Sequence, residues 1–186
     1  MQILQICHCY YPPFLDCARQ YAQLFAGTEY KVTTVYLTGK PDAEVARATC
    51  SNEVIFLGYE GRQVRGLKLD AIRRIRKLAT ERDFLFCITH RAKPTYVALF
   101  ATRLPVISVH HNFGDFGRLS RRLVVNLFRK RLLLLGVSDA VRDEIRRHLP
   151  AWPSGQIETL YNRIDVEAVQ ADLLSREQAR QHLGLP

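Results

Sequence analysis

Apolar runs alternate with amphipathic stretches along the whole chain. Some runs are almost continuously apolar, as at 84–88 and 132–135, and this is typical of strands buried on both faces. The apolar runs predict seven strands, near residues 3–9, 31–37, 53–58, 84–89, 105–110, 132–137 and 157–161. The amphipathic stretches predict helices near residues 14–26, 66–80, 94–103, 117–130, 138–148 and 167–183. This alternation indicates an α/β fold, a doubly wound Rossmann-like parallel sheet with helices on both faces.

Turn and cap residues agree with these boundaries. Pro94 suits the first turn of a helix, and Ser138 is a natural N-cap with Asp139 in the turn that follows. Two prolines in 150–153 end the helix before them. Residues 40–52 are polar and rich in turn formers, so we expect an exposed loop there.

The chain has 186 residues, of which 47% are hydrophobic, enough for one domain with its own core. No apolar run reaches the ~20 residues of a bilayer span. Met1 leads directly into a strand pattern, without a basic, cleavable leader. The cysteine count of five is odd and no Cys-x-x-Cys pair occurs, which favours reduced thiols. These features favour a cytoplasmic protein.

The triplet Cys7-His8-Cys9 is a local pattern that suggests a metal site. In a strand, however, Cys7 and Cys9 share one face while His8 points to the other, so the three side chains do not converge on one ion. The first predicted loop also lacks the glycine fingerprint of a dinucleotide binder and the Walker pattern of a phosphate loop. We therefore expect no metal and no bound cofactor.

The formal net charge of +9 favours an anionic partner. The excess is concentrated in residues 62–82 and 115–150, where basic residues outnumber acidic ones. On charge alone, nucleic acid, anionic lipid and phosphorylated substrates all remain open. No helix-turn-helix, RRM or zinc-finger pattern accompanies the charge, so we expect no nucleic-acid partner.

Polar and basic side chains follow successive predicted strands. The carboxyl ends of parallel strands meet at one edge of the sheet, where ligands bind in such folds, so we expect these side chains to gather around one crevice. The candidates for acceptor or substrate binding are His8, Tyr11, Asp16, His90, Arg91, Lys93, His111, Ser138 and Asn162. His110 ends the fifth predicted strand and belongs to the same rim.

Several candidates also have a purely structural explanation. Arg91 and Lys93, at the start of a predicted helix, suit a sugar phosphate or a carboxylate, but they also fit a solvated basic turn. Asp16 either faces acceptor hydroxyls or caps the first helix. His110 either hydrogen-bonds a sugar or is a structural histidine of the core.

The predicted helix at 117–130 is basic and amphipathic. Leu119, Leu123 and Leu127 share one side of it, and arginines are spread over the others. The candidates for contact with an anionic membrane are Arg118, Arg121, Arg122 and Arg129. The alternative is an apolar stripe buried in the core and a solvated basic face.

Five features follow one another along the chain. They are Tyr11-Pro12-Pro13, His110 after an apolar strand, Val137-Ser138, Asn162-x-x-Asp165 and Leu183-Gly-Leu-Pro186. This ordered set spans nearly the whole chain and resembles the GT-B retaining glycosyltransferases of family 4. Two departures occur: Asp16 and Cys17 stand where that family usually has two glycines near the donor diphosphate, and Arg163 replaces a usual glycine.

The resemblance implies that residues 1–165 form the N-terminal, acceptor-binding Rossmann-like lobe and that residues 166–186 form a linker helix to a second lobe, absent from this sequence. The implied reaction transfers a hexose from a nucleotide sugar, with retained anomeric configuration, to a lipopolysaccharide core or another bacterial surface glycan. A similar histidine in the family contributes to catalysis, so His110 is the expected catalytic residue. The donor-binding motif belongs to the second lobe, and the chain alone is expected to be inactive. Such enzymes often work on membrane-borne acceptors, which implies a peripheral place at the inner face of the plasma membrane.

Two other classes remain open. An α/β domain of this kind could bind an anionic sugar or lipid headgroup without catalysis. A nucleotide-dependent oxidoreductase is disfavoured because the glycine fingerprint is absent.

Overall fold

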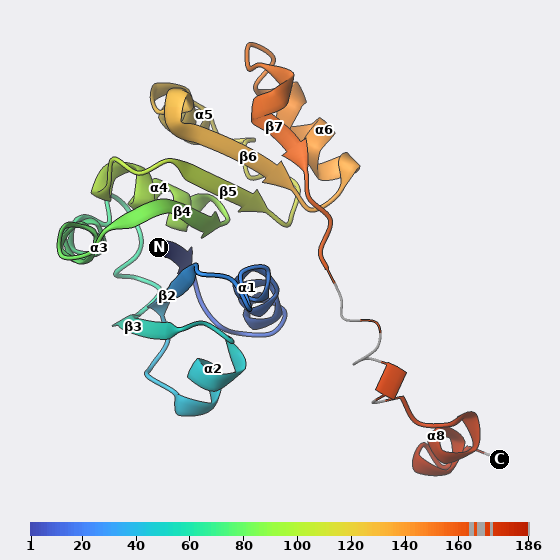
Figure 1. Ribbon diagram of the computed structural model, residues 1–186. Helices are drawn as coiled ribbons and strands as arrows, with labels where there is room; N and C mark the ends of the chain where they lie inside the picture. The colour runs from blue at the N-terminus through green and yellow to red at the C-terminus, as the bar shows by residue number, and fades with distance from the viewer. Residues whose placement is uncertain (164–165, 167–169, 172, 186) are drawn as a thin grey trace.

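The computed structural model describes residues 1–163, 166, 170–171 and 173–185 of the chain (Figure 1). Its centre is one parallel sheet of seven strands in the order β3-β2-β1-β4-β5-β6-β7. The strands are β1 Gln2–Cys7, β2 Lys31–Thr38, β3 Glu53–Tyr59, β4 Phe84–His90, β5 Val106–His110, β6 Leu132–Gly136 and β7 Ile157–Thr159. The predicted doubly wound α/β fold is confirmed.

The helices that connect the strands lie on both faces of this sheet (Figure 1). They are α1 Phe14–Gln23, α2 Ala43–Ala48, α3 Leu69–Thr80, α4 Ala92–Ala101, α5 Leu119–Leu127 and α6 Asp139–His148. The chain runs outward from β1 to β3, then crosses back to β4 beside β1 and continues to β7. Right-handed crossovers therefore put α1 and α2 on one face and the later helices on the other. Within the described ranges, no helix has the length and apolar character needed to span a bilayer.

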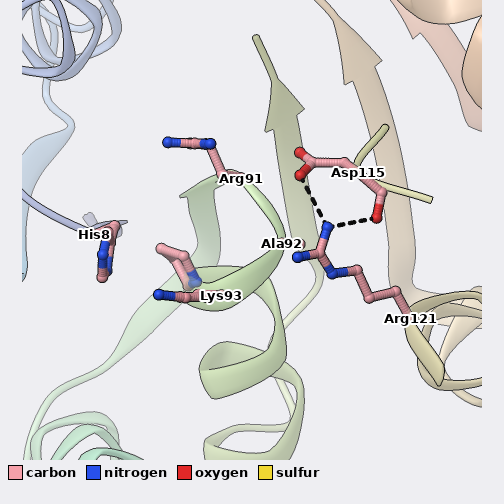
Figure 2. A pocket seen from close by; sticks show the side chains of 7 residues that line it. His8, Arg91, Ala92, Lys93, Asp115 and Arg121 are labelled. Carbon is pink, nitrogen blue, oxygen red and sulfur yellow. Dashed lines mark hydrogen bonds and ion pairs between the residues drawn. The ribbon is translucent and has the colours of Figure 1, made fainter. Parts of the chain in front are cut away.

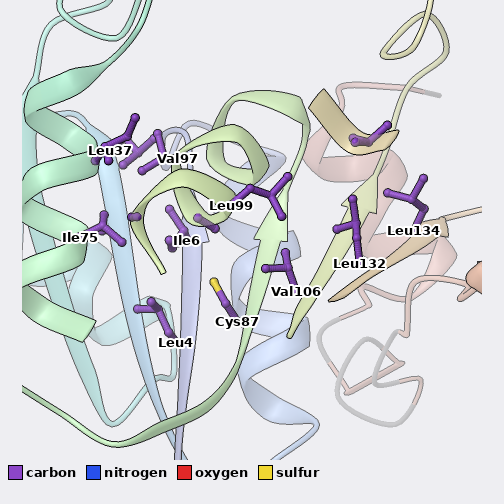
Figure 3. Packing of buried hydrophobic residues seen from close by; sticks show 14 of the residues in the cluster. Leu4, Ile6, Leu37, Ile75, Cys87, Val97, Leu99, Val106, Leu132 and Leu134 are labelled. Carbon is purple, nitrogen blue, oxygen red and sulfur yellow. The ribbon is translucent and has the colours of Figure 1, made fainter. Parts of the chain in front are cut away.

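Successive side chains of β1 point to opposite faces of the sheet and pack in two separate cores. Leu4 and Ile6 belong to the larger core, where they pack with Ile75 of α3 and Val97 of α4 (Figure 3). Ile3 points to the other face and packs in the core beneath α1. Full burial of each such side chain stabilises the fold by about 1.5–3 kcal/mol. The strand sequences are continuously apolar because helices cover both faces of the sheet.

The expectation of a loop over 40–52 is wrong, since α2 lies inside this segment. The side chain of Asp42 accepts hydrogen bonds from the main-chain N–H groups of Glu44 at 2.8 Å and Val45 at 3.1 Å. An N-cap of this kind satisfies two otherwise unpaired donors, and the alanines that follow have the highest helix propensity. Val45 packs against the neighbouring core and holds the short helix in place.

The last predicted helix, 167–183, is described in part. Residues 173–175 are not helical, so the prediction of one continuous helix is wrong. A separate helix, α8 Arg176–His182, begins after them with a reciprocal capping box between Ser175 and Gln178, which starts a new helix at this point. None of the side chains of α8 is buried. Residues 167–169 and 172 lie outside the described residues, as does Asp165 at the predicted end of the lobe.

Gly136 ends β6 at a point where the next turn packs closely against it. A Cβ added there would lie 2.6 Å from the main-chain nitrogen of Arg142 and 3.1 Å from the carbonyl oxygen of Ser138. We expect Gly136→Ala to lower the free energy of unfolding by about 1–3 kcal/mol in urea denaturation, because overpacking must move the main chain. Gly155→Ala is the matched control, since nothing lies within 4 Å of its added Cβ. An equal loss of unfolding free energy in the two variants would contradict the close packing of the main chain around Gly136.

Candidate functional site

A pocket opens at the carboxyl edge of the sheet, where the strand order reverses between β1 and β4. Ligands bind at this position in open α/β sheets. The pocket has a volume of about 160 Å³ and is lined by His8, Arg91, Ala92, Lys93, Pro94, Asp115 and Arg121 (Figure 2). The structure thus brings together three of the predicted candidates: His8 follows β1, and Arg91 and Lys93 follow β4.

Arg91 joins β4 to α4 through a strained main chain. Its φ of 73° and ψ of 168° lie in a region that is essentially restricted to glycine. The N–H of Arg91 donates to the carbonyl of Val109 at 2.8 Å, and the carbonyl of Arg91 accepts from the Thr95 hydroxyl at 2.9 Å. The guanidinium lies 5.1 Å from the ring centroid of Phe14. Neighbouring elements therefore hold Arg91 in a conformation that it would not adopt alone.

Asp115 supplies a carboxylate to the pocket. Its Oδ2 lies 2.7 Å from Nδ1 of His110, and its Oδ1 accepts from Arg121 at 3.3 Å. Arg121 also donates to the main-chain carbonyl of Asp115 at 2.9 Å (Figure 2). Burial alone would raise the pKa of Asp115, but the hydrogen bond with His110 and the nearby charges, Arg121 among them, hold it below its usual value. Asp115 is therefore ionised at neutral pH.

His110 lies beneath Asp115 and is fully buried. An ionised carboxylate only accepts, so Nδ1 of His110 donates to Asp115, and Nε2 of His110 lies 2.9 Å from the hydroxyl oxygen of Ser108. Ser108 in turn lies 2.6 Å from the hydroxyl of Thr95, which holds the Arg91 carbonyl. Both ring nitrogens of His110 are thus engaged by this chain, and His110 reaches the pocket through Asp115.

Asp115 is absent from the residues that the sequence predicted. It lies five residues after the strand end, beyond the point where the candidates stop at His111. The sequence signal for it is the pair of glycines at 114 and 117, which is typical of a turn. In the structure, Gly114 has a φ of 81°, and its carbonyl accepts a hydrogen bond from the N–H of Gly117 at 3.3 Å. This turn brings the carboxylate back over the end of β5.

Buried His90 and half-buried His111 form a second pair near the pocket. Nδ1 of His90 lies 3.2 Å from Nε2 of His111, whose Nδ1 lies 3.6 Å from Sγ of Cys17. Nε2 of His90 lies 3.5 Å from Oε1 of Gln5, a fully buried side chain of β1. Burial and the neighbouring histidines lower the pKa of His90 to about 3, and burial with His110 and other neighbours lowers that of His111 to about 4. Both imidazoles are neutral at pH 7.

The remaining candidates do not line this pocket. Asp16 lies in the first turn of α1 and pairs with Arg19 at 2.8 Å, and both side chains are exposed. Tyr11 is also exposed. Ser138 accepts a hydrogen bond from the main chain of α6 as its N-cap, and Asn162 is exposed beyond β7.

α5 does not bury its leucine stripe. Leu119, Leu123 and Leu127 are 64%, 61% and 72% exposed, whereas Val125 on another side of the helix is buried. The alternative of a stripe buried in the core of this lobe is therefore wrong. Large apolar side chains grouped on one exposed helix face usually mark a contact surface.

The four arginines predicted for membrane contact are not equivalent. Arg118 and Arg129 are exposed, and Arg122 is half-buried. Arg121 lines the pocket, where it holds Asp115. The sequence alone assigned Arg121 to the outer surface, but its hydrogen bonds turn it inward.

All five cysteines are free, and Cys7, Cys9, Cys17 and Cys87 are buried. Burial is the main cause of the raised pKa of Cys7, Cys9 and Cys17, so these thiols stay protonated. Within the described part of the chain, no group of three His, Cys, Asp or Glu side chains is arranged to hold a metal ion.

The model of the family described as Glycosyltransferase Family 4 matches residues 16–168. The chain belongs to glycosyltransferase family 4. This result confirms the resemblance carried by the ordered motifs, and the sheet topology fits the N-terminal lobe of the GT-B fold. No curated protein matches the chain.

Solved structures share the fold at low sequence identity. A glycosyltransferase from Rickettsia africae has a TM-score of 0.73 at 11% identity, over 100% of this chain and 50% of that one. Anabaena HepE in complex with UDP and glucose has a TM-score of 0.71 at 16% identity, over 99% and 50%. The lipopolysaccharide outer core galactosyltransferase WaaB has a TM-score of 0.66 at 11% identity, over 89% and 47%. The chain thus spans about half the length of these structures.

UDP-N-acetylglucosamine 2-epimerases also share this fold. At such low identity, likeness to solved structures establishes the fold alone. The family assignment therefore rests on the match to residues 16–168.

The buried histidines make stability depend on pH. A histidine whose pKa is lowered on folding binds protons more readily in the unfolded chain, so stability falls as the pH falls below about 6.5 and is fully present above it. For His90, with a folded pKa of about 3, the loss at pH 5 relative to pH 8 is about 2 kcal/mol. We expect His90→Gln to remove about this much of the difference in unfolding free energy between the two pH values. His182→Gln, at an exposed position of α8, is the control; an undiminished pH dependence in His90→Gln would contradict the assignment.

Proposed function

We propose that this chain is the acceptor-binding lobe of an enzyme that transfers a hexose from a nucleotide sugar, with retention of configuration, to a lipopolysaccharide core or another bacterial surface glycan. The nucleotide sugar is a substrate, and no metal takes part in the proposal. The donor half of the site belongs to a second lobe, so the chain by itself is inactive in this proposal.

The family assignment supports the transferase class, and the pocket at the β1–β4 switch point carries the proposal for this lobe. The fold shared with WaaB supports a lipopolysaccharide acceptor. HepE, which was solved with UDP and glucose, supports a nucleotide-sugar donor. The chain spans about half of these structures, and in the proposal the other half of such a structure supplies the donor side of the site.

In the proposed mechanism, Asp115 orients the acceptor. The ionised carboxylate accepts a hydrogen bond from a sugar hydroxyl, which is the attacking group in glycosyl transfer. Arg121 and His110 hold the two oxygens of Asp115 in place. His110, the residue expected to be catalytic, is then a positioning residue that acts through Asp115, because its own nitrogens face Asp115 and Ser108.

In the full-length enzyme, we expect Asp115→Asn to lower turnover about 10- to 100-fold, because a hydrogen bond to a charged group contributes about 1.5–3 kcal/mol. The assay follows transfer of labelled hexose to lipopolysaccharide core, and NMR of the product gives the anomeric configuration. Adding His110→Ala to Asp115→Asn should cost little more than Asp115→Asn alone, since the two residues act as a unit. His110→Gln, which can still donate to Asp115, should retain more activity than His110→Ala.

Asp143→Asn is the control for this series, because Asp143 is an exposed carboxylate of α6 paired with Arg142. Full activity in Asp115→Asn would refute the role of Asp115. Binding of sugars without any release of nucleotide would favour the non-catalytic binding domain instead.

We also propose that α5 places the enzyme at the cytoplasmic face of the membrane. Three exposed leucines stand on this helix, with the exposed cations Arg118 and Arg129 at its two ends. An apolar stripe flanked by cations suits the boundary between anionic headgroups and acyl chains. Each arginine near such a surface contributes on the order of 1 kcal/mol.

Cosedimentation with liposomes tests this surface. The variant with Arg118, Arg122 and Arg129 changed to Gln should bind anionic vesicles about 100-fold more weakly, and high salt should weaken the wild type in the same direction. Changing the three leucines to Ser should weaken binding at every salt concentration, because apolar insertion is not screened.

A triple variant at Arg47, Arg62 and Arg73, which are exposed outside α5, provides the control with the same loss of charge. Equal binding of the wild type to anionic and zwitterionic vesicles would refute an electrostatic contribution of the arginines to membrane binding. Equal losses in the two arginine variants would show that α5 is not the contact surface.

A further inference from the structure

The pocket carries more positive charge than this chain neutralises. Asp115 pairs with Arg121. Arg91 and Lys93 also line the pocket, and among the described residues neither forms a salt bridge. In Figure 2 these two cations stand on one side of the pocket and the Arg121–Asp115 pair on the other. Two positive charges therefore remain uncompensated.

The cations of the pocket repel one another. Burial lowers the pKa of Lys93, and the charges of Arg65, Arg91 and Arg121 lower it further. Burial, Lys93 and Arg91 lower the pKa of His8 to about 4, so this imidazole is neutral at pH 7. Like charges held together in this way disfavour the empty pocket and favour a bound anion.

The main-chain N–H groups at the start of α4 also favour a bound anion. Ala92 and Lys93 are the first two residues of α4, whose first N–H groups have no partner within the helix, and no side chain caps it. The glycine-like main chain of Arg91 immediately precedes them. Strained residues of this kind persist where the surroundings hold a functional group in place.

We infer that this pocket binds a phosphate group, and that in the proposed transferase the group is a phosphate monoester on the acceptor. The inference rests on the proposed function only for the origin of the phosphate. A phosphate monoester carries about −1.5 to −2 charges and three acceptor oxygens, which match the two uncompensated cations better than a carboxylate does. The volume of about 160 Å³ suits one such group, since pockets that enclose whole ligands measure about 300–1,000 Å³.

Calorimetric titration of the full chain with inorganic phosphate and with glucose 6-phosphate tests the site. Both should bind saturably and at one site, whereas glucose, which is uncharged, and acetate, which carries a single negative charge, should bind at least about 10-fold more weakly. The phosphate in this pocket could belong to the acceptor or to the diphosphate of the nucleotide-sugar donor, and a titration with UDP distinguishes the two. Tighter binding of UDP than of glucose 6-phosphate at this site would assign it to the donor and overturn the acceptor assignment.

Lys93→Gln and Arg91→Gly should each weaken phosphate binding at least about 10-fold. Arg91→Gly should also unfold at an equal or higher urea concentration than the wild type, because glycine adopts a φ of 73° without strain. Loss of binding in this variant therefore does not reflect unfolding. Lys31→Gln is the control: Lys31 is exposed at the first residue of β2, at the opposite edge of the sheet.

Phosphate binding that is unchanged in Lys93→Gln and Arg91→Gly would overturn the site. So would binding of glucose as tight as that of glucose 6-phosphate. These outcomes are distinct from failure of the proposed transferase, which is measured by hexose transfer in the full-length enzyme. Undiminished hexose transfer by the Lys93→Gln variant would leave the proposed function standing and would overturn the phosphate site on the acceptor side.

Discussion

The parallel pairing of β1 with β4 joins the two halves of the sheet, and the lining of the pocket depends on it. Ile6 of β1 is in register with Thr89 of β4, so His8 and Arg91 emerge at the same edge. The helices that follow these strands pack on opposite faces of the sheet, which leaves the space between their first turns open. Buried Gln5 stands near this junction, where it contacts His90 and donates to the hydroxyl of Thr34 on the next strand. A shift in register would separate these groups.

A group of buried polar side chains connects the sheet to the pocket. Beneath Asp115, the chain of contacts runs through His110, Ser108 and Thr95 to the Arg91 carbonyl. This group therefore couples the carboxylate on one side of the pocket to the cation on the other. Such a network is stable only when each member has its partner, because an unpaired buried polar group costs about 1–3 kcal/mol. The arrangement of charge in the pocket is thus set by the core below it.

α5 combines two different environments in nine residues. Val125 is buried and Val124 and Phe128 pack against the larger core, which fixes the helix to the lobe. The opposite stripe of leucines remains exposed, and Arg121 leaves the helix toward Asp115. The same helix therefore contributes a residue to the pocket and an apolar face to the surface. The hydrophobic effect favours covering that face, and the cations at its ends favour an anionic partner.

The order of strands and helices was readable from the sequence, because strands buried on both faces are continuously apolar and the helices between them have caps and turn residues. The rule that ligands meet the carboxyl edge of a parallel sheet also located His8, Arg91 and Lys93 in advance. The sequence did not reveal α2, since a short helix leaves too few apolar positions to show a period. Only the tertiary structure decided that Asp115 turns back onto His110, that Arg121 faces inward, and that the leucines of α5 face outward. A helical period shows which residues share a side, but what that side contacts depends on segments distant in the chain.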